Sequence, residues 1–196
     1  MKIVVIGATG TIGKAVVKLL SGRHEVVQAS RSAGVQVDID DPASVRAFYA
    51  KLGAKVDAIV CAAGNAVFKP LAGLSDDDFA ASLRSKLMGQ VNVVRYGIEH
   101  VSDHGSFTLT SGVLSLRPMQ GSAAISPVNA AVEAFARAAA LELPRGIRIN
   151  TVSPGWVTDT LQALGMDPSQ GQAPEVVAKA YVASITGEQT GQTISP

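Results

Sequence analysis

A glycine-rich segment near the start of the 196-residue chain constrains its fold more than any other feature. Residues 7–13 read Gly-Ala-Thr-Gly-Thr-Ile-Gly. They follow the apolar run 3–6 and lead into residues 11–20, whose apolar side chains recur at helical spacing. A chain that turns sharply from a buried strand into a helix, with its backbone close to an anion, favours glycine because glycine has no side chain.

The N–H groups at the start of a helix are free to bind an anion, so this segment predicts a loop that binds the phosphates of a dinucleotide. An ordinary glycine-rich turn is the alternative. The position of the segment between the first strand and the first helix favours the dinucleotide. The residues expected to bind there are Gly7, Thr9, Gly10, Thr11 and Ile12.

Short runs rich in β-branched residues alternate with helical segments along the rest of the chain. Such alternation is typical of parallel strands joined by right-handed helical crossovers. No repeat or change in composition divides the chain. We therefore expect residues 1–196 to form a single NAD(P)-binding domain of α/β class, a Rossmann-type doubly wound parallel sheet of about seven strands in three layers. The expected strands are 3–6, 26–27, 35–37, 56–60, 106–110, 147–152 and 190–194, and the expected helices are 11–20, 42–52, 75–100, 129–143 and 174–185.

The composition argues against several classes of function. A formal net charge of +1 and an aromatic content of 5% give no reason to expect nucleic acid or an anionic membrane as a partner. Cys61 is the only cysteine, so no internal disulfide is expected. No stretch is long and apolar enough to span a bilayer, and no His, Cys and carboxylate cluster has metal-ligand spacing. We expect a cytoplasmic protein without a metal.

The second expected strand indicates which dinucleotide binds. An NAD site usually carries an acidic residue there for the ribose hydroxyls, whereas an Arg accommodates the 2′-phosphate of NADP. The sequence after this strand has no acid and reads Ser30-Arg31-Ser32. A guanidinium between two hydroxyls suits a phosphate, so we expect NADP(H) to be favoured over NAD(H). A solvated Arg in a loop is the alternative.

Taken with these residues, the chain resembles the short-chain dehydrogenase/reductase family over nearly its whole length. Besides the glycine segment, the matching motifs are Asp38-Ile39, Cys61-Ala62-Ala63-Gly64, Thr110-Ser111 and Arg148-Ile149-Asn150 through Ser153-Pro154-Gly155. The resemblance implies the strand order 3-2-1-4-5-6-7. It also implies that Asp38 and Ile39 contact the adenine, that Ala62, Ala63 and Gly64 line the cofactor site, and that Pro154, Gly155 and Val157 hold the nicotinamide.

The family's catalytic Tyr-x-x-x-Lys pair is replaced in this chain. Ile125 stands at the Tyr position and Asn129 at the Lys position, while the family's catalytic Asn falls at Lys86. Ser111 keeps the identity of the family's catalytic Ser. The Tyr hydroxyl transfers the proton that accompanies hydride transfer, and Ile125 cannot do so. The chain therefore resembles the small group of family members that keep the cofactor site without the usual pair.

Two residues are candidates for the missing chemistry. Lys86, beside the expected nicotinamide ribose, is interpreted either as a replacement acid tuned by burial or as a residue that only binds the cofactor. Ser111 either polarises a substrate carbonyl or forms a hydrogen bond at the end of a strand.

Two classes of function follow. One is an NADP(H)-dependent oxidoreductase acting on a small carbonyl or alcohol substrate with a degenerate active site. The other is a non-catalytic dinucleotide-binding redox sensor or regulatory protein. The resemblance also implies a homodimer or homotetramer, which we expect to form through the alanine-rich residues 130–141 and the helix that ends near His100.

Overall fold

Seven parallel strands form one sheet in a computed structural model that describes residues 1–163 and 165–196. The strand order is β3-β2-β1-β4-β5-β6-β7, and every pair of neighbours runs parallel. The expected sheet and its order are confirmed. The strands are β1 (Lys2–Ile6), β2 (Glu25–Ser30), β3 (Val35–Gln36), β4 (Val56–Cys61), β5 (Val101–Thr110), β6 (Arg148–Val152) and β7 (Thr193–Ile194).

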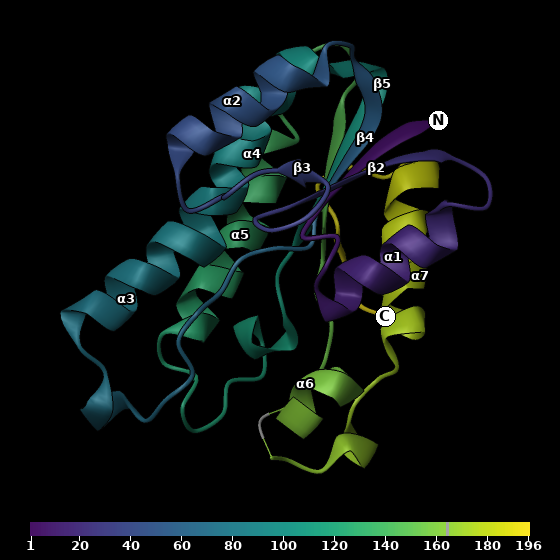
Figure 1. Ribbon diagram of the computed structural model, residues 1–196. Coiled ribbons are helices and arrows are strands. Elements are labelled where there is room, and N and C mark those ends of the chain that lie inside the picture. The colour runs from purple at the N-terminus through teal and green to yellow at the C-terminus, as the bar shows by residue number, and fades with distance from the viewer. Residues whose placement is uncertain (164) are drawn as a thin grey trace.

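Helices cover both faces of the sheet and give the three layers of the fold. Helices α1 and α7 pack together on one face, and α2, α4 and α5 lie on the other (Figure 1). The helices are α1 (Thr11–Leu20), α2 (Pro42–Leu52), α3 (Asp76–Ser82), α4 (Gln90–Gly97), α5 (Ile125–Ala139), α6 (Thr158–Ala163) and α7 (Pro174–Thr186).

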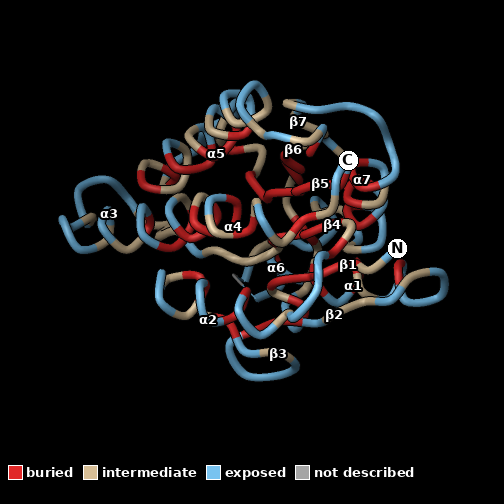
Figure 2. Tube along the Cα trace, turned by 90° about the horizontal axis from the view of Figure 1, so that it is seen from above, coloured by how far each residue is buried: buried red, intermediate tan, exposed pale blue. Residues whose placement is uncertain are grey.

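The core lies between the sheet and each helical layer, because the strands are buried on both faces. Along β1, Val4 and Ile6 belong to the cluster under α2, α4 and α5, whereas Ile3 and Val5 belong to the cluster under α1 and α7. Figure 2 shows the strands as a buried centre inside largely exposed helical surfaces. This two-sided burial explains why the strands are continuous apolar runs in the sequence.

The helical stretch expected over residues 75–100 is helical but not uniform. Ser75 and the carboxylate of Asp78 form a reciprocal capping box at its start, which satisfies two backbone donors. Beyond α3, residues 83–89 form a π-helical turn before α4 begins, and a short 3-10 helix (Ile98–His100) ends the stretch. Such turns occur frequently at functional sites.

The expected boundaries of α5 and the expected start of β5 were wrong. Helix α5 begins at Ile125 and ends at Ala139, four residues before the expected range at both ends. Pro127 lies in its first turn, where a missing N–H costs nothing. Strand β5 begins at Val101 rather than at 106. A register irregularity against β4 and the left-handed backbone of His104 (φ 60°) break the apolar pattern there.

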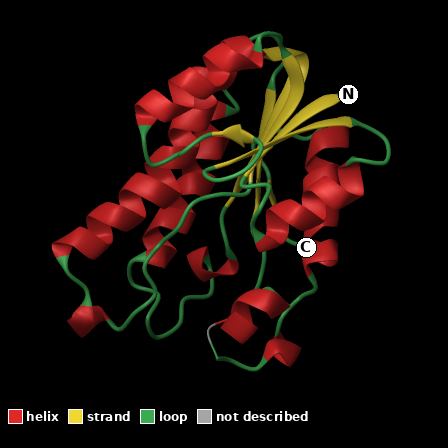
Figure 3. Cartoon of the chain, in the orientation of Figure 1, coloured by secondary structure: helices red, strands yellow, loops and turns green. Residues whose placement is uncertain are grey.

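The carboxyl ends of the strands lie along one edge of the sheet. The loops after β4, β5 and β6 leave this edge and extend well beyond it, with α6 below them (Figure 3). In open α/β sheets, ligands bind outside the carboxyl ends of the strands, so the candidate site is sought there.

Candidate functional site

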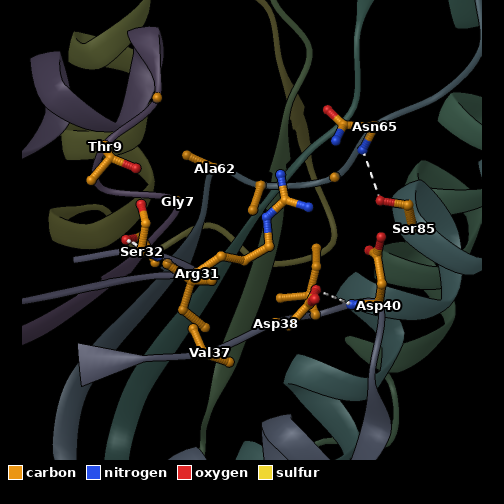
Figure 4. Close-up of a pocket in the computed structure, with 16 residues that line it drawn as sticks. Gly7, Thr9, Arg31, Ser32, Val37, Asp38, Asp40, Ala62, Asn65 and Ser85 are labelled. Carbon is orange, nitrogen blue, oxygen red and sulfur yellow. Dashed lines mark hydrogen bonds between the residues drawn. The ribbon is translucent and has the colours of Figure 1, made fainter. Parts of the chain in front are cut away.

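A cavity of about 270 Å³ opens at the carboxyl ends of β1, β2 and β4 (Figure 4). Eleven of the residues expected to bind the cofactor line it: Gly7, Thr9, Gly10, Ser30, Arg31, Ser32, Asp38, Ile39, Ala62, Ala63 and Gly64. The structure therefore brings together four separate sequence segments in one place.

The backbone of the glycine loop lies close to Ala62, the residue that follows β4. Gly7 has a φ of 85°, and a Cβ added there would lie 2.7 Å from the carbonyl oxygen of Ala62. A Cβ added at Gly13 would lie 2.0 Å from the carbonyl oxygen of Gly7. Both positions therefore require glycine, one for its backbone conformation and both for space.

The loop also fits the phosphates of a dinucleotide. The N-cap residue Gly10 contributes no side-chain hydrogen bond to α1. Within the described residues, the amides of Thr11, Ile12 and Gly13 donate to no protein acceptor. Free donors at a helix N-terminus, backed by the helix dipole, suit an anion. Thr11 and Ile12 lie at this helix start, beside the cavity lining.

The loop after β2 is shaped by Ser30 and leaves Arg31 available. The Ser30 hydroxyl donates to the carbonyl of Ala33 at 2.7 Å and accepts from the Ala33 amide at 2.9 Å. Its role in the structure is to close the loop. The Arg31 side chain is exposed and extends into the cavity toward Ala62 and Asn65 (Figure 4). Among the described residues it forms no ion pair.

The cavity is also lined by Asp40, Asn65 and Ser85, which the motifs recognised in the sequence did not include. Asp38 accepts from the amide of Asp40 at 3.1 Å, and the amide of Asn65 donates to the Ser85 hydroxyl at 3.0 Å (Figure 4). Asp40 directly follows the motif Asp38-Ile39, and Asn65 directly follows Gly64. Their position beside these motifs could have identified both as candidate site residues. Ser85 reaches the loop only through tertiary packing, for which the sequence holds no local signal.

Lys86 follows Ser85 in the π-helical turn and is 8% exposed. Burial lowers the pKa of its amine from 10.5 to about 8. Its side chain runs past Gly64, where an added Cβ would lie 3.3 Å from the Lys86 Cδ. The nearby thiol of Cys61 is fully buried, and burial raises its pKa to about 11. A buried amine therefore lies directly behind the cavity wall.

Ser111 lies at the end of β5, where its hydroxyl is already engaged. Its Oγ donates to the Glu133 Oε1 at 2.6 Å, and a second, longer contact of 3.2 Å reaches the carbonyl of Asn129. Glu133, on α5, is 5% exposed. Glu133 was not predictable as a site residue, because a single carboxylate in an alanine-rich helix indicates a surface position.

Ile125 and Asn129 lie one turn apart on α5 and precede Glu133 on the same helical face. Asn129 is buried, and its Nδ2 donates to the carbonyl of Gly112 at 3.4 Å. Its Oδ1 is also buried and has no hydrogen-bond partner among the described residues. An orphaned buried acceptor at this point suits a ligand that brings a donor.

The segment expected to hold the nicotinamide follows β6 beside Ser111. The carbonyl of Pro154 accepts from the amide of Val113 at 2.8 Å, and Val157 is paired with Gln172. Pro154 and Val157 are buried and Gly155 is partly exposed. These three residues and Lys86 lie outside the cavity lining.

A family model described as enoyl-(acyl carrier protein) reductase matches residues 7–194. The short-chain dehydrogenase/reductase ucsE of Acremonium sp is 30% identical over 190 residues, which cover 79% of this chain and 72% of that protein. The chain belongs to the short-chain dehydrogenase/reductase family of NAD(P)-binding oxidoreductases.

Solved structures agree with this assignment. The protein lin1944 from Listeria innocua is 43% identical with a TM-score of 0.95, and the match covers 100% of this chain and 98% of that one. A small-chain dehydrogenase solved in complex with NADPH is 28% identical with a TM-score of 0.88, over 100% of this chain and 96% of that one.

Two further findings concern the described part of the chain. No group of three or more His, Cys, Asp or Glu side chains in residues 1–163 and 165–196 is placed to hold a metal ion. Over the same residues, no helix combines the length and the apolar character needed to cross a membrane.

Proposed function

We propose that this protein binds NADP(H) and is an oxidoreductase acting on a small carbonyl or alcohol substrate. The observation that carries the proposal is a cavity lined both by the glycine loop that leads into α1 and by Arg31, which forms no ion pair among the described residues. The NADPH complex of a relative supports the choice of dinucleotide. When bound, the dinucleotide supplies or accepts the hydride.

The residues of this chain then have distinct roles. The amides of Thr11, Ile12 and Gly13 bind the pyrophosphate, and Arg31 binds the 2′-phosphate together with Ser32. Asp38 and Ile39 contact the adenine. Pro154, Gly155 and Val157 hold the nicotinamide. Lys86 and Asn129 lie on the ribose side, and Ser111 lies nearest the reacting groups.

A second function is favoured by one observation. Ile125 carries no proton to transfer and Asn129 carries no charge, so the usual acid–base pair is missing. A protein that binds the dinucleotide without turnover, as a redox sensor or a regulator of another protein, would need neither residue.

One experiment separates the two functions. NADPH and NADH are titrated against the protein with fluorescence detection. NADPH oxidation is then measured with a panel of ketones and aldehydes, and NADP⁺ reduction with a panel of small alcohols. We expect tighter binding of NADPH and slow turnover. Tight binding without turnover of either panel supports the regulatory function, and failure to bind either dinucleotide contradicts both.

A further inference from the structure

Three serine hydroxyls converge on one carboxylate oxygen at the carboxyl edge of the sheet. The Oε1 of Glu133 accepts from Ser111 at 2.6 Å, from Ser115 at 2.7 Å and from Ser153 at 3.3 Å. Ser111 follows β5 and Ser153 follows β6, the strands whose ends carry the expected catalytic and nicotinamide segments. The carboxylate therefore lies behind the part of the site where chemistry is expected.

Glu133 is buried without a cation beside it among the described residues. No ion pair among the described residues includes it, although it is 5% exposed. Burying an unpaired carboxylate costs several kcal/mol, which hydrogen bonds only partly offset. A Gln would offer the same acceptor oxygen to the three serines at a lower cost. A purely structural role therefore does not account for a carboxylate at this position.

We propose that Glu133 is the proton acceptor behind Ser111, and that the two residues together replace the missing Tyr in proton transfer. This inference rests on the proposed oxidoreductase function. Ser111 is the catalytic residue because it meets the substrate hydroxyl. Glu133 acts through Ser111 and touches no substrate.

The direction of the hydrogen bond from Ser111 to Glu133 determines in which direction a proton can move along the pair. The single hydroxyl proton of Ser111 is donated in the hydrogen bond to Glu133 Oε1, so the Ser111 oxygen is left as an acceptor toward the substrate. In alcohol oxidation, a hydride leaves the carbinol carbon for NADP⁺ with its electron pair, and the C=O double bond forms. The alcohol proton passes to Ser111 Oγ as the Ser111 proton passes to Glu133 Oε1. Carbonyl reduction is the reverse and begins with a protonated Glu133.

This arrangement predicts slow reduction of generic carbonyls. With Glu133 ionised, Ser111 has no proton to donate to a carbonyl oxygen. Oxidation, by contrast, needs only an acceptor at Glu133 Oε1, toward which the Ser111 hydroxyl points. Alcohol oxidation with NADP⁺ is therefore the reaction in which the pair is tested.

The kinetic test is a double-mutant cycle on NADP⁺ reduction by the alcohol panel. Glu133→Gln keeps the shape and the acceptor oxygen but cannot take a proton, so we expect kcat to fall at least about 10²-fold with little change in KM. Ser111→Ala is expected to lose as much. The double variant is expected to be no slower than either single variant, because the two act in one path. The control is Glu142→Gln, an exposed carboxylate just beyond α5, with unchanged rates.

A second readout needs neither cofactor nor substrate. Infrared difference spectra between the unaltered protein and Glu133→Gln show the protonation state of this carboxyl group. We expect the loss of a carboxylate band at neutral pH, and a shift of the same band in Ser111→Ala. Loss of a protonated carboxyl band instead would overturn the inference. If Glu133→Gln does not fold, the band shift and the rate of NADP⁺ reduction in Ser111→Ala test the inference in its place.

The outcomes separate this inference from the proposed function. Turnover that survives Glu133→Gln or Ser111→Ala, or losses that add in the double variant, overturn the proton path and leave the oxidoreductase function standing. NADPH binding without turnover of either panel overturns the proton path and leaves dinucleotide binding standing. Failure to bind a dinucleotide overturns both.

Discussion

At the scale of single residues, Lys86 shows how burial and charge compete. Its amine lies in the π-helical turn, almost wholly removed from water. Burial disfavours the charged form, which lowers the pKa to about 8. The unfolded chain keeps the ordinary value of 10.5, so the two states bind different numbers of protons between these values.

This difference predicts the pH dependence of stability. Between about pH 8 and 10.5 the unfolded chain holds a proton on Lys86 that the folded chain has lost, so the contribution of Lys86 to the free energy of unfolding rises with pH across this window. Below about pH 8 the folded chain bears the full free-energy cost of keeping the buried Lys86 amine charged, which is about 3 kcal/mol. Lys86→Met removes it. The stability gap between the variant and the unaltered protein should shrink by about that much as pH rises through the window.

Urea unfolding at a series of pH values measures this gap. Lys179→Met, which replaces an exposed lysine on α7, is the matched control and should leave the pH curve unchanged. Parallel curves for Lys86→Met and the unaltered protein would contradict the prediction.

Arg31 allows a second prediction at this scale. Its guanidinium is unpaired within the described residues and extends into the cavity. If it binds the 2′-phosphate, Arg31→Ala should remove the preference for NADPH over NADH, at a cost of about 1.5–3 kcal/mol for a charge-assisted bond. Parallel titrations with both dinucleotides measure the preference.

Arg23 supplies the control for Arg31. It is exposed and lies between α1 and β2, on the opposite edge of the sheet, so Arg23→Ala should change neither affinity. Equal affinities of the unaltered protein for NADPH and NADH would remove the role assigned to Arg31.

At the scale of elements, the junction of β1 with α1 tolerates no side chain at Gly13. An added Cβ would meet the carbonyl oxygen of Gly7 at 2.0 Å, and neither group can move without displacing the loop. We expect Gly13→Ala to destabilise the fold by at least about 2 kcal/mol and to abolish dinucleotide binding. Gly22, at the far end of α1, has open space around it. Chemical denaturation and NADPH titration should therefore show little change for Gly22→Ala.

The elements also show what the sequence could predict. The strands β1 and β4 were predictable because burial on both faces makes them continuous apolar runs. The start of β5 was not, because residues 102–105 are polar or glycine and pair through an irregular register. The start of α5 was missed because Pro127 suggests a helix break, although a proline in the first turn interrupts no hydrogen bond.

Some residues of the candidate site were likewise predictable from the sequence, and others were not. Arg31 and the glycine loop lie within contiguous motifs, so local sequence was enough to place them. Glu133 contacts Ser111 across 22 residues of chain and Ser153 across 20. Such contacts depend on how α5 packs against the ends of β5 and β6. Only the folded structure brings these residues together.

At the scale of the whole molecule, helix α5 and the residues after it present small and apolar side chains to solvent. Helix α5 and the residues after it leave Ala134, Ala138 and Leu141 exposed, and Leu141 is 89% exposed. We expect this surface to join two copies of the chain, because small side chains allow helices to approach closely. Sedimentation velocity at micromolar concentration should show a dimer or tetramer, and Ala134→Arg should shift it to monomer. A stable monomer of the unaltered protein would contradict the expectation.

Because Cys61 is buried, the reactivity of its thiol can be used to measure unfolding of the protein. The thiol lies in a central strand with no exposed surface, and its raised pKa keeps it protonated and inert at neutral pH. A thiol-reactive dye can label it only after the sheet opens, so the labelling rate should follow the population of opened molecules. Since Cys61 is the only cysteine, the signal needs no engineered label. Any ligand that binds only the folded chain should slow labelling in proportion to its occupancy, whereas rapid labelling of the native protein would mean that β4 opens locally.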